Sequence, residues 1–207
     1  MAACPDWSQP ESADQLPDVA RGMKDVTRFI LKRAESFIIN HGNLKDWHLT
    51  VFRSSVPLRY YAGNFRSEDP ERPCLATPVF IGRYQGADYR AVPSEMDGFS
   101  AALHSYIVVT DAFIATKPTF ANRVRATLEL ASWAVGRFIQ IHPFLNGNGR
   151  ISRLLANYFF VRYGLGIAYF ESLPRPGGEY GMAMEGCMAG DFKLLYRYFV
   201  ILLATQT

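Results

Sequence analysis

Nine residues, from His142 to Arg150, combine side chains and backbone that suit phosphate chemistry. The run HPFLNGNGR holds one imidazole, two asparagines, two glycines and an arginine, and Arg153 follows three residues later. Imidazole is the side chain that most readily exchanges a proton near neutral pH. Two guanidinium groups one helical turn apart can each bond phosphate oxygens in a bidentate way. These residue types therefore predict proton transfer beside a bound polyphosphate.

Helical patterns on both sides place this run at a junction between two helices. Residues 122–141 carry apolar residues at helical spacing, and a second such pattern begins near Asn148. The first N–H groups of a helix lack internal partners, and the helix dipole is positive there. Gly147 and Gly149 allow the backbone to bend and to approach a ligand closely. We therefore expect an anion site at the start of the second helix, directly after His142.

A simpler interpretation of the same run stays open at this point. Clusters of glycine and asparagine are most often turns. A single histidine is more often structural than catalytic. Residue types alone do not choose between a turn and a phosphate site.

The rest of the chain predicts a mainly helical domain with one small hairpin. Residues 1–18 are rich in Pro, Ser and acidic residues and are expected to form a flexible tail, which leaves residues 19–207 as one domain. Helical spacing marks residues 19–42, 93–109, 122–141, 149–164, 179–189 and 192–204. Residues 43–92 are expected to be irregular, except for a hairpin formed by the β-prone residues 78–81 and 87–92.

Composition excludes several classes of protein. The net charge of +3 and the lack of a dominant basic run argue against nucleic acid as a partner. The longest apolar run, Tyr198 to Ala204, is too short to span a bilayer, so no membrane contact is expected. Cys4, Cys74 and Cys187 are odd in number and widely spaced, which predicts neither disulfides nor a zinc site. With no signal peptide pattern, a cytoplasmic location is expected, and delivery into another cell stays open.

The order of residues in the motif resembles a known signature. His-Pro-Phe-x-x-Gly-Asn-Gly-Arg-x-x-Arg, at residues 142–153, is similar to the motif of the Fic (filamentation induced by cAMP) family. Residues 79–99 resemble the β-hairpin flap and following helix of Fic proteins, and residues 179–199 resemble their C-terminal helices. The resemblance implies a Fic-fold helical bundle with a small β-hairpin flap.

The resemblance also implies an activity. Most Fic enzymes transfer AMP from ATP to a Ser, Thr or Tyr hydroxyl of a target protein, with Mg²⁺ bound, and release pyrophosphate. Carried over to this chain, His142 is the base that takes the proton of the target hydroxyl. The phosphate site is implied to consist of the motif residues that follow it: Gly147, Asn148, Gly149, Arg150 and Arg153.

Target docking is implied for the flap. In Fic proteins this hairpin holds the target segment by strand addition. The corresponding residues here are Val79, Phe80, Ile81, Asp88 and Tyr89. A plain surface hairpin is the alternative.

Arg66 and the remaining histidines have no such motif. Fic proteins often have an arginine before the flap, so Arg66 is either a residue that reaches the site or an exposed loop arginine. His41, His48 and His104 show no ligand spacing and are expected to be surface or core residues.

Asn146 departs from the family pattern. Most active members carry Asp or Glu there as a ligand of Mg²⁺, a cation that prefers anionic oxygen. The uncharged Asn146 predicts weak binding of Mg²⁺ or Mn²⁺. Two functions stay open: transfer of AMP or of another phosphate-linked moiety, and nucleotide binding with little or no transfer.

Regulation also differs from many family members. Many carry an inhibitory helix with Ser/Thr-x-x-x-Glu-Gly/Asn, and this chain has no such string. Self-inhibition of that kind is not predicted, and an antitoxin-like inhibitory partner stays open.

Overall fold

The computed structural model describes residues 3–7, 16–168 and 178–205. Within these residues there are seven α-helices, three short 3-10 helices and one two-stranded antiparallel sheet, which confirms the mainly helical prediction. The α-helices are α1 (Leu16–Arg33), α2 (His41–Phe52), α3 (Val92–Ala115), α4 (Phe120–Ile141), α5 (Asn148–Arg162), α6 (Gly178–Met188) and α7 (Lys193–Ala204). The 3-10 helices are η1 (Ala34–Ser36), η2 (Arg59–Tyr61) and η3 (Pro73–Leu75), and the strands are β1 (Phe80–Ile81) and β2 (Tyr84–Gln85).

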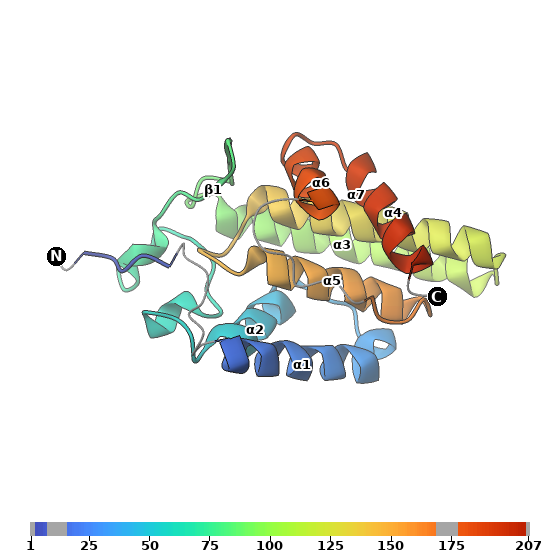
Figure 1. Ribbon diagram of the computed structural model, residues 1–207, viewed down its shortest axis with the longest axis horizontal. Helices are drawn as coiled ribbons and strands as arrows, with labels where there is room; N and C mark the ends of the chain where they lie inside the picture. Colours follow the sequence, from blue (N-terminus) through green and yellow to red (C-terminus); the bar gives the residue numbers. More distant parts are fainter. Residues whose placement is uncertain (1–2, 8–15, 169–177, 206–207) are drawn as a thin grey trace.

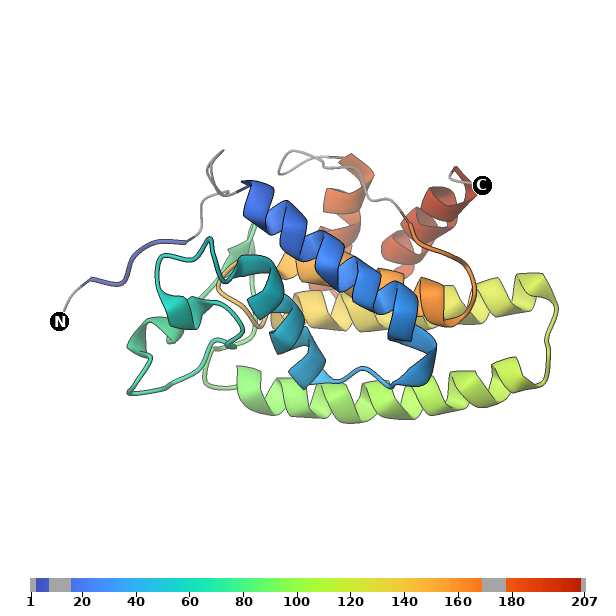
Figure 2. The same cartoon turned by 90° about the horizontal axis from the view of Figure 1, so that it is seen from below.

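Helices α4 and α5 form the centre of the bundle. They pack against each other, α1 and α2 cover α5 on one side, and α6 and α7 cover α4 on the other (Figure 1). Helix α3 runs alongside α4, and the turn between them projects beyond the other helices (Figure 2). The facing sides of α4 and α5 supply fully buried side chains such as Val135, Phe138, Leu155 and Phe159. The turn between the two central helices is the motif loop (residues 142–148), so it is fixed at both ends by the core.

Helix α2 was missed by the pattern, which placed a helix stop at Gly42. The side-chain oxygen of Asn40 accepts the N–H groups of Gly42 and Asn43, and the side chain of Asn43 accepts the Asn40 N–H in return. Such a reciprocal cap starts a helix. Gly42 is therefore in the first turn of a helix, and the preceding helix ends earlier, at Arg33.

Helix α3 is unusually apolar for its position. Among the described residues it alone is long and apolar enough to cross a membrane, by length and composition only. Residues on one side of it, including Phe99, Leu103 and Ile107, are buried in the bundle. Packing against α4 therefore accounts for part of its apolar character.

The predicted hairpin is present but shorter than expected. Phe80 pairs with Gln85 and Ile81 with Tyr84, so the two strands are joined at Gly82 and Arg83. The expected second arm at residues 87–92 is not a strand. The carboxylate of Asp88 bonds the backbone and guanidinium of Arg90, which favours a turn, and α3 begins at Val92.

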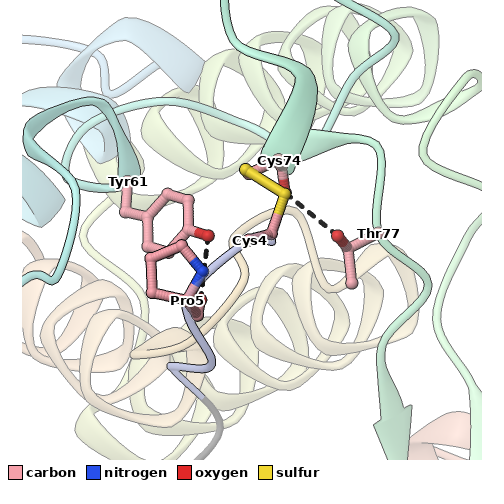
Figure 3. The surroundings of a disulfide bond; sticks show 5 residues. All are labelled: Cys4, Pro5, Tyr61, Cys74 and Thr77. Carbon is pink, nitrogen blue, oxygen red and sulfur yellow. Dashed lines mark hydrogen bonds between the residues drawn. A yellow bond between two sulfur atoms is a disulfide. The ribbon is translucent and has the colours of Figure 1, made fainter. Parts of the chain in front are cut away.

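The N-terminal residues differ most from expectation. A disulfide joins Cys4 to Cys74, so the prediction of no disulfide was wrong (Figure 3). Trp7 is 8% exposed and belongs to the core, so the expected flexible tail does not describe residues 3–7. We call residues 3–7 the N-terminal segment. The cysteines are 70 residues apart, a separation that no local pattern reveals.

Candidate active site

His142 ends α4 in an unusual backbone conformation. Its φ of 50° and ψ of 60° are left-handed, and its N–H donates to the carbonyl of Phe138 at 2.9 Å. Few residues other than glycine adopt this conformation, and it persists where surrounding structure enforces it. The side chain is half-buried. The position of the predicted base is therefore set by its neighbours.

Arg66 is the main brace of His142. The Arg66 side chain is fully buried and donates to four carbonyls: His142 at 2.9 Å, Ile141 at 3.0 Å, Ala87 at 2.8 Å and Thr77 at 3.3 Å. Burial lowers the pKa of the Arg66 guanidinium to about 10, so it stays charged at neutral pH. Arg66 thus connects the end of α4 to both arms of the flap, and it is not an exposed loop arginine.

Gly86 braces the other side of His142. A Cβ added at Gly86 would lie 2.8 Å from the Cβ of His142 and 3.2 Å from Nη2 of Arg66. Backbone hydrogen bonds hold Gly86 and Ala87 in place: the Gly86 N–H donates to the carbonyl of Val79, and the Ala87 N–H donates to the carbonyl of Ile141. The flap base therefore approaches the predicted base so closely that only glycine fits.

Asn148 has a structural role that the sequence did not predict. Its amide nitrogen donates to the carbonyl of Phe144 at 2.8 Å, and its Oδ1 accepts the Phe144 N–H at 3.0 Å. The side chain is buried and closes the loop between the two residues. These two bonds use one N–H of the side-chain amide, so the predicted contact of its second N–H with phosphate stays a prediction.

The two motif glycines have different environments. Gly147 has a φ of 80°, and a Cβ there would lie 2.4 Å from the ring of Phe52. Its N–H donates to Oδ1 of Asn146 at 2.7 Å, so this amide is engaged within the loop. A Cβ at Gly149 would meet no protein atom within 4 Å. Packing therefore requires glycine at position 147 but not at position 149.

The two motif arginines follow at the start of α5. The guanidinium of Arg150 lies over the ring of Phe52, 5.6 Å from its centre. Arg153 lies 6.0 Å from the ring centre of Tyr180, and its Nε donates to the carbonyl of Gly149 at 2.9 Å. Each guanidinium is thus supported by an aromatic ring from another helix.

A cavity of about 340 Å³ opens beside Arg153, between α1 and α5. Lys24 and Arg28 of α1 also line it, so three cationic side chains surround one space. No aspartate or glutamate lines this cavity within the described residues. The arrangement suits an anion with several negative charges.

The flap lies at the His142 side of the loop. Phe80 in β1 is 64% exposed, and Ile81 is half-buried. Val79 accepts the Gly86 N–H at the base of the hairpin. Asp88 and Tyr89 lie beyond β2, in the turn before α3. The predicted docking residues are therefore divided between the hairpin and the turn that follows it.

Asn146 does not fit the role of a metal ligand. Its amide nitrogen donates to the carbonyl of Trp7 at 2.7 Å, and its Oδ1 accepts the Gly147 N–H. Among the described residues no group of three or more His, Cys, Asp or Glu side chains could hold a metal ion. A hard cation prefers anionic oxygen ligands, whereas Asn146 offers one neutral oxygen that already accepts a hydrogen bond.

His48 is a site residue that the sequence pattern did not identify. Its Nδ1 accepts the Gly63 N–H at 2.9 Å, so the ring proton is on Nε2, which donates to the carbonyl of Asn146 at 3.1 Å. The ring stacks on Phe144 with 3.8 Å between centres. Burial lowers the pKa of His48 to about 3. The ring is therefore neutral and shapes the motif loop; only its contacts reveal this role.

Comparison with known proteins decides the family. Residues 38–160, more than half of the chain, match the Fic/DOC family. The chain belongs to this family. It is 25% identical over 142 residues to the protein adenylyltransferase Fic of Nematostella vectensis, which covers 69% of this chain and 27% of that protein. It is 49% identical over 35 residues to a Fido domain-containing protein of Dictyostelium discoideum, covering 17% and 24% of the two chains. The chain thus spans about a quarter of the length of these relatives.

Solved Fic structures share the fold. A Fic domain containing signaling protein from Bacteroides thetaiotaomicron superposes with a TM-score of 0.69 at 20% identity, covering 94% of this chain and 71% of that one. Fic-1 from C. elegans gives 0.68 at 20% identity, covering 96% and 52%. BepC from Bartonella tribocorum, solved with bound AMPPNP, gives 0.62 at 13% identity, covering 91% and 86%. The Fic fold predicted from the motif is confirmed.

Proposed function

We propose that this Fic protein is a nucleotidyltransferase that moves AMP from ATP to a Ser, Thr or Tyr hydroxyl of a target protein. The observation that carries the proposal is the pairing of a braced histidine with a cationic helix start. Arg66 and Gly86 fix the position of His142. Arg150 lies eight residues after His142, and it and Arg153 lie near the start of α5. Membership of the Fic/DOC family supports the same conclusion.

The chemistry follows from these positions. His142 accepts the proton of the target hydroxyl as the hydroxyl oxygen attacks the α-phosphorus of ATP. The bond from the α-phosphorus to the bridging oxygen breaks, and pyrophosphate leaves with that electron pair. Arg150, Arg153 and the positive end of α5 stabilise the charge on the phosphates. We assign no step to a metal held by the protein.

Lys24 and Arg28 extend the phosphate site in this proposal. They line the same cavity as Arg153, which suits the terminal phosphate of a triphosphate. The flap supplies an edge to which an extended target segment can pair. Phe80, exposed in β1, is the apolar contact available to that segment.

The test is transfer of labelled AMP from ATP to proteins of a cell lysate. The His142→Ala variant is expected to lose the label while its unfolding transition stays close to that of the wild type. His104→Ala is the matched control, because His104 is an exposed histidine of α3. Labelling by His142→Ala at the wild-type level would show that His142 is not the base.

Asn146 supports a second candidate function, nucleotide binding without transfer. Its side chain is engaged by Trp7 and Gly147 and offers no anionic ligand. Calorimetry would then show ATP binding to a protein that labels nothing under any added metal. Any labelling that depends on His142 rules this candidate out.

A further inference from the structure

Asn146 connects the motif loop to the N-terminal segment, across 139 residues of sequence. The bond runs from the amide nitrogen of Asn146 to the carbonyl of Trp7. Only a donor can make it, and a carboxylate at this position has none. The replacement of the family carboxylate by an amide is therefore matched to a contact that this chain makes with its own N-terminus.

Further contacts hold the N-terminal segment against the domain. The hydroxyl of Tyr61 donates to the carbonyl of Pro5 at 3.0 Å, next to the Cys4–Cys74 disulfide (Figure 3). The Trp7 indole packs against three rings: it stacks on Tyr61 and meets Phe52 and His48 edge-on. The N-terminal segment is thus attached by the disulfide, by hydrogen bonds at Pro5 and Trp7, and by the buried Trp7 side chain.

These contacts reach the phosphate site directly. Phe52 meets Trp7 on one side and supports the guanidinium of Arg150, and it also limits the space at Gly147. His48 meets Trp7 and donates to the Asn146 carbonyl. Any movement of Trp7 therefore changes the packing behind both Asn146 and Arg150.

The covalent bond decides whether the segment stays attached. Ordering the backbone of these residues costs conformational entropy, which the hydrogen bonds and the buried indole offset in part. A covalent link reduces that cost by keeping the segment close to its site.

The disulfide is open to reduction at one end. Cys4 is exposed, whereas Cys74 is 7% exposed. A dithiol reductant breaks the bond between the two sulfurs, both cysteines become thiols, and the reductant is oxidised to its own disulfide. Thr77 connects Cys74 to Arg66 and so to the base of the flap. The Thr77 hydroxyl donates to the carbonyl of Cys74, and the Thr77 carbonyl accepts from the Arg66 guanidinium.

We propose that the N-terminal segment is a redox-controlled cover of the motif loop, and that Asn146 is its docking residue and not a metal ligand. In the oxidised protein the Cys4–Cys74 bond keeps Trp7 docked on Asn146. In the reduced protein the segment leaves, and Asn146 and the packing behind Arg150 are released. In a reducing compartment, such as the cytoplasm expected from the sequence, the uncovered form prevails.

Hydrogen exchange of the full chain, without nucleotide, tests this cover independently of the proposed function. Peptides from residues 3–7 and 142–150 are compared in oxidised protein, in protein treated with dithiothreitol and in Cys4→Ser. Reduction and Cys4→Ser are each expected to raise exchange in the N-terminal segment at least about tenfold, with a smaller rise in the motif loop. Cys187→Ser is the control, because Cys187 is buried in α6 and outside the disulfide.

Two results would overturn the cover. One is equal exchange in the oxidised and reduced wild type after thiol trapping has shown that reduction is complete. The other is finding Cys4 and Cys74 as free thiols in air-oxidised protein. The wild-type comparison needs no substitution, so poor folding of Cys4→Ser does not affect it.

ATP affinity measured on the same samples links the cover to the proposed function. The cover should restrict the phosphate site, so ATP binding is expected to become at least about tenfold tighter after reduction. Equal affinity in the two states would show that the segment does not control the phosphate site. Failure to bind ATP in either state counts against the proposed function alone, since the exchange data stand without it.

Discussion

The two ends of the motif loop are held by distant parts of the chain in opposite ways. At the first end, the Arg66 side chain donates to the backbone carbonyl of His142, so this contact does not involve the imidazole. At the second end, the N-terminal segment holds Asn146 by its side chain, and both polar atoms of that amide are engaged. A brace through the backbone does not involve the side chain, whereas a brace through the side chain does. Five changes test this comparison.

Loss of Arg66 should have the largest effect. Arg66→Met removes the buried donor of four carbonyls and is expected to destabilise the fold by about 3 kcal/mol. Transfer activity should fall with it, because His142 loses its brace. Urea unfolding measures the first effect and AMP labelling the second. Arg59→Met, at an exposed arginine, is the control, and an equal loss in both variants would contradict the account.

The two motif glycines should separate packing from ligand approach. Gly147→Ala forces a Cβ against Phe52 at a positive φ, with an expected loss of about 2 to 3 kcal/mol in unfolding free energy. Gly149→Ala meets no protein atom and should keep or slightly raise stability, by up to about 1 kcal/mol. Its ATP affinity should nonetheless fall about tenfold or more, because the added methyl stands where phosphate approaches. Unchanged affinity in Gly149→Ala would contradict the proposed phosphate site.

Acid pH should lower the free energy of unfolding through His48, which bonds the carbonyl of Asn146. The pKa of His48 is about 3 in the folded protein and near 6.5 when unfolded, so the unfolded chain binds the extra proton between these values. Stability from this group is complete above about pH 6.5 and falls by about 1.4 kcal/mol per unit as pH drops toward 3. Urea midpoints at about pH 7, 6 and 5 measure the slope. The His48→Gln variant should show a weaker dependence of unfolding free energy on pH, and His104→Gln should not. An unchanged slope in His48→Gln would show that other groups cause the pH dependence.

Asn146→Asp is expected to lower the free energy of unfolding by only about 1 to 2 kcal/mol. The carboxylate cannot donate to the Trp7 carbonyl, so the N-terminal segment should exchange faster even with the disulfide intact. Asn157→Asp, in α5, is the matched control: it loses a buried hydrogen bond from the side-chain amide to the carbonyl of Ala168, at a position away from the N-terminal segment. Equal exchange of residues 3–7 in Asn146→Asp and wild type would contradict the docking role.

The sequence predicted those features that depend on local pattern. Helices α4 and α5 show clear apolar spacing, and the motif loop between them is identified by consecutive residues. Helix α2 was missed because its start depends on a side-chain cap between Asn40 and Asn43, next to a glycine that resembles a stop.

The braces of the site could not be predicted, because they join positions far apart in the chain. Arg66 and His142 are 76 residues apart, His48 and Asn146 are 98 apart, and Trp7 and Asn146 are 139 apart. The sequence also did not reveal the structural role of Asn148. Its residue type suits a phosphate contact, but its side-chain hydrogen bonds to Phe144 close the loop. Residue types predict where the site lies, and the contacts show which side chains already bond within the protein.

The most direct test of this division of roles is one labelling experiment with three samples. Oxidised wild type, reduced wild type and reduced His142→Ala are incubated with labelled ATP and lysate, and protein-bound label is measured. The account predicts at least about tenfold more label in reduced than in oxidised wild type, and none above background in reduced His142→Ala. Equal label in reduced wild type and reduced His142→Ala would contradict it.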